Sequence, residues 1–118
     1  MDFETIREYA LSKRAATEGM PFGDSVLVFK VMNKIFLMMN FEVPFELSLK
    51  CEPERAVELR ERYEAITPGF HMNKSHWNTV VMDGSIPRKL IYEMIDHSYE
   101  QIVQSLSKKL KQEYNLIK

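Results

Sequence analysis

The stretch from Ser25 to Lys50, SVLVFKVMNKIFLMMNFEVPFELSLK, constrains the fold more than any other part of the chain. It is rich in Val, Ile, Phe and Met, and β-branched and aromatic residues favour strands. Asn33-Lys34 interrupts the apolar residues, which predicts a hairpin with arms Ser25–Met32 and Ile35–Asn40. Pro44 ends the second arm, because proline cannot donate to a strand ladder. We therefore expect an antiparallel sheet at the centre of the fold.

The flanking residues complete the predicted fold. Phe45, Leu47 and Leu49 alternate with polar residues, as in a strand with one buried face. Capping residues, helical spacing and alternation predict the remaining elements. Before the hairpin we expect a helix capped by Asp2 and an edge strand within residues 14–25, and after it a helix from Pro53 that ends at the turn Thr67-Pro68-Gly69 and a strand from Trp77 to Met82. The next helix has Ser85 as cap and Pro87 in its first turn, and continues from Ser98 to Leu106 with or without a kink near Asp96; Ser107 caps a last helix. The expected class is α+β: a single antiparallel sheet of about five strands with helices packed on one face, an N-terminal helix and two to three C-terminal helices.

Size and charge narrow the class of protein. A chain of 118 residues is expected to form one domain, residues 1–118. The formal charge of −1 argues against a dedicated nucleic-acid binder, since such proteins usually carry a basic excess. The single cysteine, Cys51, cannot form an internal disulfide, which predicts a cytoplasmic protein. The acidic N-terminal segment predicts no signal peptide. The longest apolar run, Ile35–Met39, is too short to span a membrane, so we expect no membrane among the partners.

The block from Phe70 to Ser85, FHMNKSHWNTVVMDGS, mixes residue types that are typical of a site. His71 and His76 would need Asp83 or His97 nearby to hold zinc or iron, and their spacing matches no metal signature. We therefore expect polar loop histidines, no metal and no cofactor. Asparagines in such a loop satisfy the loop's own backbone.

Catalytic chemistry has weaker support. Cys51 beside a histidine would be a nucleophile, but a lone cysteine at a strand end is more often an inert thiol. Tyr99 and Ser98 would donate into a pocket, although Tyr99 is more simply a core residue with a satisfied hydroxyl. No GxSxG, P-loop or GxGxxG motif is present, so we expect binding rather than catalysis and assign no catalytic residue.

Charge is unevenly spread along the chain. Residues 104–118 hold four lysines and one acid. Lys50, Lys74 and Arg88 would join this basic tail if the fold brings them together, and a shared cationic surface would suit phosphates. A solvated terminal helix with favourable charges near its C-terminus explains the tail equally well.

Several short motifs resemble the MmcQ/YjbR family. They are PFG at Pro21–Gly23, LKCEP at Leu49–Pro53, PGFHMNKSHWNTV at Pro68–Val80, DGSIP at Asp83–Pro87 and DHSYE at Asp96–Glu100, and together they cover nearly the whole chain. Two departures are Glu52, where aspartate or serine is the commoner cap, and the Lys-rich extension after Leu106. The resemblance implies a small bacterial cytoplasmic protein similar to frataxin-like and secretion-chaperone-like folds. It also implies the family's usual description, a predicted DNA-binding protein with a double-wing motif, and it supplies no catalytic residues.

We therefore expect a nucleic-acid-binding protein that contacts phosphates. The candidate contact residues are Lys34, Lys50, His71, Asn73, Lys74, His76 and Arg88, together with the terminal lysines. Trp77, Asp83 and Tyr99 are expected to be structural, with Trp77 filling the interface between sheet and helices. One alternative is a protein-interaction module, because the eight methionines would form an adaptable surface or simply fill the core. The other is a small-ligand or enzymatic pocket that contains His71, His76 and Tyr99.

Overall fold

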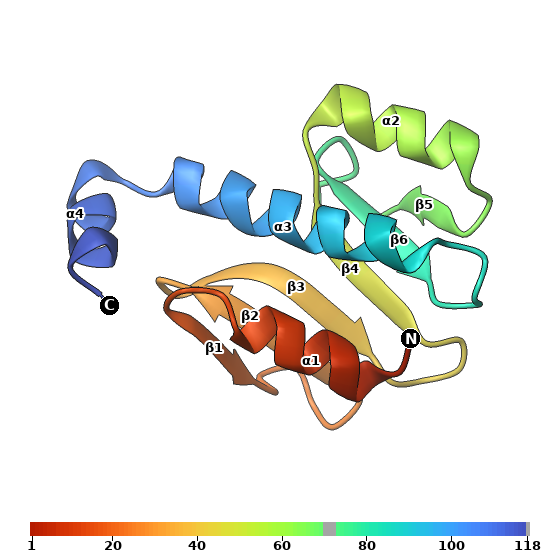
Figure 1. Ribbon diagram of the computed structural model, residues 1–118, viewed down its shortest axis with the longest axis horizontal. Coiled ribbons are helices and arrows are strands. Elements are labelled where there is room, and N and C mark those ends of the chain that lie inside the picture. The colour runs from red at the N-terminus through yellow and green to blue at the C-terminus, as the bar shows by residue number, and fades with distance from the viewer. Residues whose placement is uncertain (70–72, 118) are drawn as a thin grey trace.

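The computed structural model describes residues 1–69 and 73–117 and contains one six-stranded sheet flanked by helices (Figure 1). The elements in chain order are α1 (Phe3–Leu11), β1 (Ala16–Gly19), β2 (Val26–Val31), β3 (Lys34–Asn40), β4 (Glu46–Lys50), α2 (Pro53–Arg62), β5 (Ile66–Pro68), β6 (Trp77–Val81), α3 (Arg88–Ser105) and α4 (Lys108–Leu116). The strands lie in the order β1-β2-β3-β4-β6-β5, and every neighbouring pair is antiparallel. The predicted α+β class is confirmed, with six strands rather than about five.

The central hairpin forms where the sequence predicts it, with its turn one residue earlier. Met32 and Asn33 both have positive φ angles, 48° and 66°, as a two-residue turn that follows the strand twist requires. Lys34 is therefore the first residue of β3, paired with Val31, and does not lie in the turn. A register shift between Phe29 and Lys30 marks a bulge in this hairpin.

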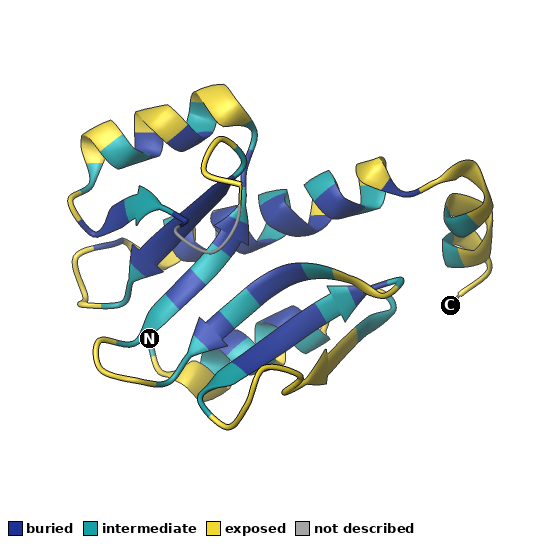
Figure 2. Cartoon of the chain, turned by 180° about the vertical axis from the view of Figure 1, so that it is seen from behind, coloured by how far each residue is buried: buried dark blue, intermediate teal, exposed yellow. Residues whose placement is uncertain are grey.

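The hydrophobic core lies between one face of the sheet and three helices. The sheet side chains in this core come from register partners such as Leu47 and Val80, which share a face. Helices α1, α2 and α3 add Ile6, Ala56 and Ile95, each fully buried. Figure 2 looks onto the opposite face, which no helix covers. Helix α4 has no buried residue and extends beyond the sheet (Figure 1).

Two expectations about local structure are wrong. Thr67 and Pro68 belong to β5, a three-residue strand at the sheet edge, rather than to a turn. Pro68 is tolerated there because an edge strand has one side without a ladder. Ser85 does not cap α3, since its hydroxyl donates to Asp83 Oδ1 at 2.6 Å and the N-cap residue is Pro87.

The other caps agree with the prediction. Asp2 Oδ1 accepts from Thr5 N at 2.9 Å, and Ser107 Oγ accepts from Leu110 N at 3.2 Å. Helix α3 runs through Asp96 as one helix, so the chain has no break there. In the described part of the chain, no helix has the length and apolar character needed to span a membrane.

Candidate functional site

The sheet register brings some of the predicted contact residues to one end of the sheet and places another at the opposite end. Val31 pairs with Lys34 and Lys50 pairs with Trp77, so Lys34, Lys50 and the segment 73–76 lie at the same end. Strand β6 then crosses the sheet, and Arg88 begins α3 beyond its far end. The predicted cluster is therefore divided, and Arg88 does not belong with the lysines.

The end that carries Lys34 and Lys50, here called the basic end, also receives the C-terminal lysines. Arg14 Nε donates to the carbonyl of Ile117 at 2.6 Å, and its Nη2 donates to that of Asn115 at 2.9 Å. These bonds hold α4 against the loop of residues 12–15. The exposed lysines of α4 are Lys108, Lys109 and Lys111. Tertiary contacts therefore place the basic tail at the same end as the hairpin lysine.

The loops at the opposite end, here called the acidic end, have the reverse charge. They comprise residues 20–25, 41–45, 63–65 and 82–87, and they contain Asp24, Glu42, Glu64 and Asp83 but no Lys or Arg. At the basic end, the loops at 12–15, 51–52 and 73–76 contain Lys13, Arg14 and Lys74 and one acid, Glu52. Glu52 caps α2 by accepting from two backbone amides. The loops at the two ends of the sheet thus carry opposite net charges, although the net charge of the whole chain is −1.

The segment 73–76 is held by backbone and side-chain hydrogen bonds. Asn73 Oδ1 accepts from Ser75 N at 2.9 Å, which is the backbone role expected of a loop asparagine. Arg60 Nη2 donates to the Lys74 carbonyl at 3.0 Å, and Cys51 N donates to the His76 carbonyl at 2.7 Å. Lys74 is exposed and His76 is half-buried. His71 lies outside the described residues.

Trp77 is buried, with 7% of its surface exposed, but it does not fill the interface predicted for it. It pairs with Lys50, whereas the neighbouring pair Leu49–Asn78 faces the helices. Because side chains alternate along a strand, Trp77 points to the uncovered face. Gly69 packs against it so closely that a Cβ there would lie 3.0 Å from the Trp77 Cβ.

Asp83 and Tyr99 both act within the fold. Asp83 accepts from the Ser85 amide and hydroxyl, which lowers the pKa of its carboxyl. The Tyr99 hydroxyl donates to the Arg14 carbonyl at 2.6 Å and lies 2.7 Å from the Tyr114 hydroxyl. Tyr99 thereby connects α3 to α4 and to the loop of residues 12–15, and none of its described contacts is with His76.

The histidines of the described segments do not converge on a metal site. Within residues 1–69 and 73–117, no group of three His, Cys, Asp or Glu side chains is placed to hold a metal ion. His76 and Asp83 lie at opposite ends of β6. His97 Nε2 accepts from Glu52 N at 3.1 Å, so this nitrogen is unprotonated. Burial is the main reason that the pKa of His97 is lowered.

Cys51 lies in a small buried chamber rather than in a reactive site. The chamber has a volume of about 10 Å³, enough for one water molecule, and Cys51, Asn78 and His97 line it. Burial raises the pKa of the Cys51 thiol, which disfavours the nucleophilic thiolate. Asn78 Nδ2 donates to the Ala56 carbonyl at 3.3 Å, while its Oδ1 is buried without a protein partner among the described residues. Periodicity alone did not identify this polar group in the core.

Ser98 is a second polar core residue whose role the sequence did not indicate. Its hydroxyl donates to the Phe36 carbonyl at 2.6 Å and accepts from Lys50 N at 2.9 Å. It therefore links α3 to β3 and β4 beneath the basic end. A serine within the apolar stripe of a helix was the one available signal.

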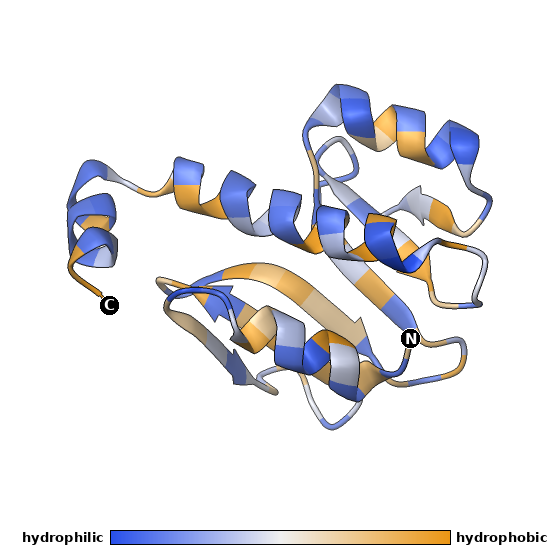
Figure 3. Cartoon of the chain, viewed as in Figure 1, coloured by the Kyte–Doolittle hydropathy of each residue, from blue (hydrophilic) through white to orange (hydrophobic). Residues whose placement is uncertain are grey.

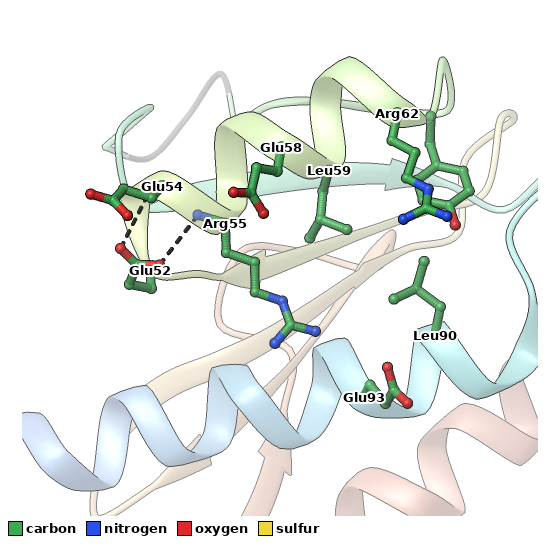
Figure 4. A pocket seen from close by; sticks show the side chains of 9 residues that line it. Glu52, Glu54, Arg55, Glu58, Leu59, Arg62, Leu90 and Glu93 are labelled. Atoms are coloured by element: carbon green, nitrogen blue, oxygen red, sulfur yellow. Dashed lines mark hydrogen bonds between the residues drawn. The ribbon is translucent and has the colours of Figure 1, made fainter.

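A groove of about 430 Å³ separates α2 from α3 (Figure 4). Leu59 and Leu90 form its apolar part, and Figure 4 shows Arg55 reaching from α2 toward α3. The charged side chains that line it are Glu52, Glu54, Arg55, Glu58, Arg62 and Glu93. Four carboxylates and two guanidinium groups line the groove, so its charge is mixed with an excess of acids.

The fold and the charge distribution define a class of small α+β proteins with an open antiparallel sheet, helices on one face and cationic loops at one end. The YjbR family model matches residues 11–101. The chain belongs to the YjbR family, which confirms the resemblance found in its motifs.

Relatives and solved structures agree with this assignment. The chain is 35% identical over 107 residues to the uncharacterized protein YjbR of Escherichia coli K12, and the aligned region covers 90% of this chain and 91% of that protein. It is 34% identical over 108 residues to the uncharacterized protein YbdF of Escherichia coli O157:H7, covering 90% and 88%. The crystal structure of Deinococcus radiodurans DR2400 aligns with a TM-score of 0.89 at 34% identity, over 96% of this chain and 87% of that one. A Pseudomonas syringae protein aligns with a TM-score of 0.75 at 26% identity, over 86% and 98%.

Proposed function

We propose that the protein binds nucleic acid through its basic end, mainly by contacts to phosphates. The observation that supports this function is the separation of charge between the two ends of the sheet, with Lys34 and Lys50 at the end that also holds Lys74 and α4. A local cationic surface attracts a polyanion even when the whole chain is slightly acidic. The lone buried thiol of Cys51 suits action in a reducing cytoplasm.

The structure of the basic end favours contact with the backbone over reading of bases. The turn at Met32-Asn33 projects from the sheet with Lys34 beside it, and the segment 73–76 projects next to Lys50. Two such projections would contact the phosphates on either side of a groove, as the double-wing description of the family implies. Trp77 is too deeply buried to stack on a base, as exposed aromatic side chains do in many single-strand binders.

Direct binding measurements test this function. We would measure the anisotropy of fluorescein-labelled duplex DNA, single-stranded DNA and RNA with the wild-type protein at low salt and at physiological salt. The expected result is weak binding of at least one of them that is nearly independent of base sequence, because phosphate contacts carry no base information. No binding of any of the three at low salt would refute the proposal.

Charge reversals locate the interface. Lys34→Glu and Lys50→Glu should each weaken binding, and Arg88→Glu at the acidic end is the matched control that should change it little. An equal effect of all three variants would mean that overall charge, and not the basic end, controls binding. Melting temperatures of the variants would be measured in parallel so that unfolding is not mistaken for a binding defect.

A further inference from the structure

Three phenylalanines form a shallow hollow at the acidic end of the sheet. Phe3 of α1 and Phe41 and Phe45 of the β3–β4 turn line a hollow of about 550 Å³, here called the aromatic hollow. The rings of Phe3 and Phe41 meet edge to face with centroids 5.0 Å apart, and those of Phe41 and Phe45 stack at 6.5 Å. Phe3 is 37% exposed, and Val43 at the tip of the turn is 98% exposed. Figure 3 shows this turn beside the start of α1.

Acidic side chains flank each ring along the chain. Asp2 and Glu4 neighbour Phe3, Glu42 follows Phe41, and Glu46 follows Phe45. Glu46 pairs with Val81 beside the buried pair Leu47–Val80, so its side chain faces the uncovered side of the sheet, away from Phe45. Glu4 lies 3.8 Å from Arg7, whereas the exposed Glu42 forms no ion pair within the described part of the structure. The pKa of Asp2 is lowered chiefly by hydrogen bonds from Thr5, with smaller contributions from the amino terminus and Arg88. Glu42 is therefore the carboxylate that neighbours Phe41 in the turn, and the surrounding loops of the acidic end contain Asp24 and Asp83 but no Lys or Arg.

The aromatic hollow is formed in advance by hydrogen bonds of the backbone around it. Phe41 N donates to the Ser25 carbonyl at 2.8 Å, and Met82 N donates to the Phe45 carbonyl at 2.9 Å. Asn40 Oδ1 accepts from Glu42 N at 3.0 Å and shapes the turn between the two rings. A surface that is already ordered loses little conformational entropy when a partner binds.

We propose that the aromatic hollow is the docking site for a partner protein, specifically for a basic segment that carries a large apolar side chain between lysines or arginines. The apolar side chain would bury the exposed phenylalanine surface, which is a favourable transfer from water. The flanking cations would face the carboxylate of Glu42 and the acidic loops of this end, and this charge complementarity sets the chemistry of the partner. The site lies at the opposite end of the sheet from the proposed nucleic-acid surface and does not depend on it.

The test uses a short fluorescein-labelled peptide in which a central Leu-Phe pair is flanked by lysines. Two matched peptides replace either the lysines by glutamate or the Leu-Phe pair by serine, and anisotropy is measured with the full chain. We expect binding of the first peptide alone. Phe3→Ser and Glu42→Lys, both at exposed positions, should each weaken it about tenfold, equivalent to about 1.4 kcal/mol. Glu113→Lys on α4 is the control that should leave it unchanged.

Three results would overturn this inference. They are no binding of the basic apolar peptide, binding that both Phe3→Ser and Glu42→Lys leave intact, and binding of the serine peptide with equal affinity. Self-association of the protein is measured separately by light scattering after gel filtration. A dimer that Phe3→Ser dissociates would show that a second copy covers the aromatic hollow, which would also contradict the proposal. Lys34→Glu should weaken nucleic-acid binding without affecting the peptide, so the two proposals fail independently.

Discussion

Lys50 and Trp77 are register partners on β4 and β6, and both side chains face the side of the sheet that no helix covers. On the other side of the same ladder, Leu49 and Asn78 face α2 and α3. The two neighbouring residue pairs of this ladder, Lys50–Trp77 and Leu49–Asn78, therefore have different roles on the two faces of the sheet. One face anchors the helices, while the other carries a lysine of the basic end next to a buried indole.

The first prediction concerns Trp77. Trp77→Ala should lower the free energy of unfolding by about 3–5 kcal/mol, because it removes the indole of a large side chain that is only 7% exposed. Urea unfolding followed by circular dichroism measures this, since the variant lacks the only tryptophan. A loss below about 1 kcal/mol would indicate that the ring packs loosely and is a surface for ligands instead.

The second prediction concerns Ser98. Ser98→Ala leaves the Lys50 amide and the Phe36 carbonyl without this partner and should cost about 2–4 kcal/mol of stability. Ser105→Ala is the matched control, because that hydroxyl bonds only to a carbonyl of its own helix. We expect the control to change stability by less than about 0.5 kcal/mol. Equal effects of the two substitutions would contradict a linking role for Ser98.

The third prediction is a dependence of stability on pH near His97. The pKa of His97 is lowered in the folded state relative to its ordinary value of 6.5, so the unfolded chain binds a proton more readily. The contribution of neutral His97 is therefore fully present above about pH 6.5 and is lost as the pH falls through the folded-state pKa. His97→Gln, whose side chain keeps an acceptor for Glu52 N, should lose less stability between pH 7.5 and 5.5 than the wild type.

Denaturant titrations at several pH values check this expectation. The carboxyls with lowered pKa, Asp2, Glu18 and Asp83, have ordinary values of 3.8 to 4.5 and act in a lower pH range. They do not obscure the window between pH 5 and 6.5. The same loss of stability in His97→Gln and in the wild type across this window would show that another group is responsible.

The fourth prediction concerns the salt dependence of nucleic-acid binding. The logarithm of the affinity should fall linearly with the logarithm of salt concentration, and each lost phosphate contact should reduce the slope by about one. Lys50→Glu should therefore flatten the slope as well as weaken binding, whereas Arg88→Glu should leave the slope unchanged. Anisotropy titrations at four salt concentrations provide the measurement. Parallel slopes for the wild type and Lys50→Glu would remove Lys50 from the interface.

The sequence by itself determined the local parts of this protein. Alternation of apolar and polar residues identified β4, the capping residues Asp2 and Ser107 identified two helix starts, and the motifs identified the family. These features depend on neighbours within a few residues, where periodicity and capping chemistry act directly. The turn of the central hairpin was misplaced by one residue, because the conformation of Met32 is imposed by strand pairing rather than by local preference.

The tertiary structure alone decided which residues act together. Alternation shows that Trp77 and Asn78 face opposite sides, but only the packing of α2 and α3 shows which side is covered. The short edge strand β5 forms because β6 offers it a ladder, and three residues carry no period of their own. Arg88 is separated from Lys50 because β6 spans the sheet between the segment 73–76 and α3. Charge along the chain is a property of composition, whereas charge at one end of a sheet follows from strand direction and order.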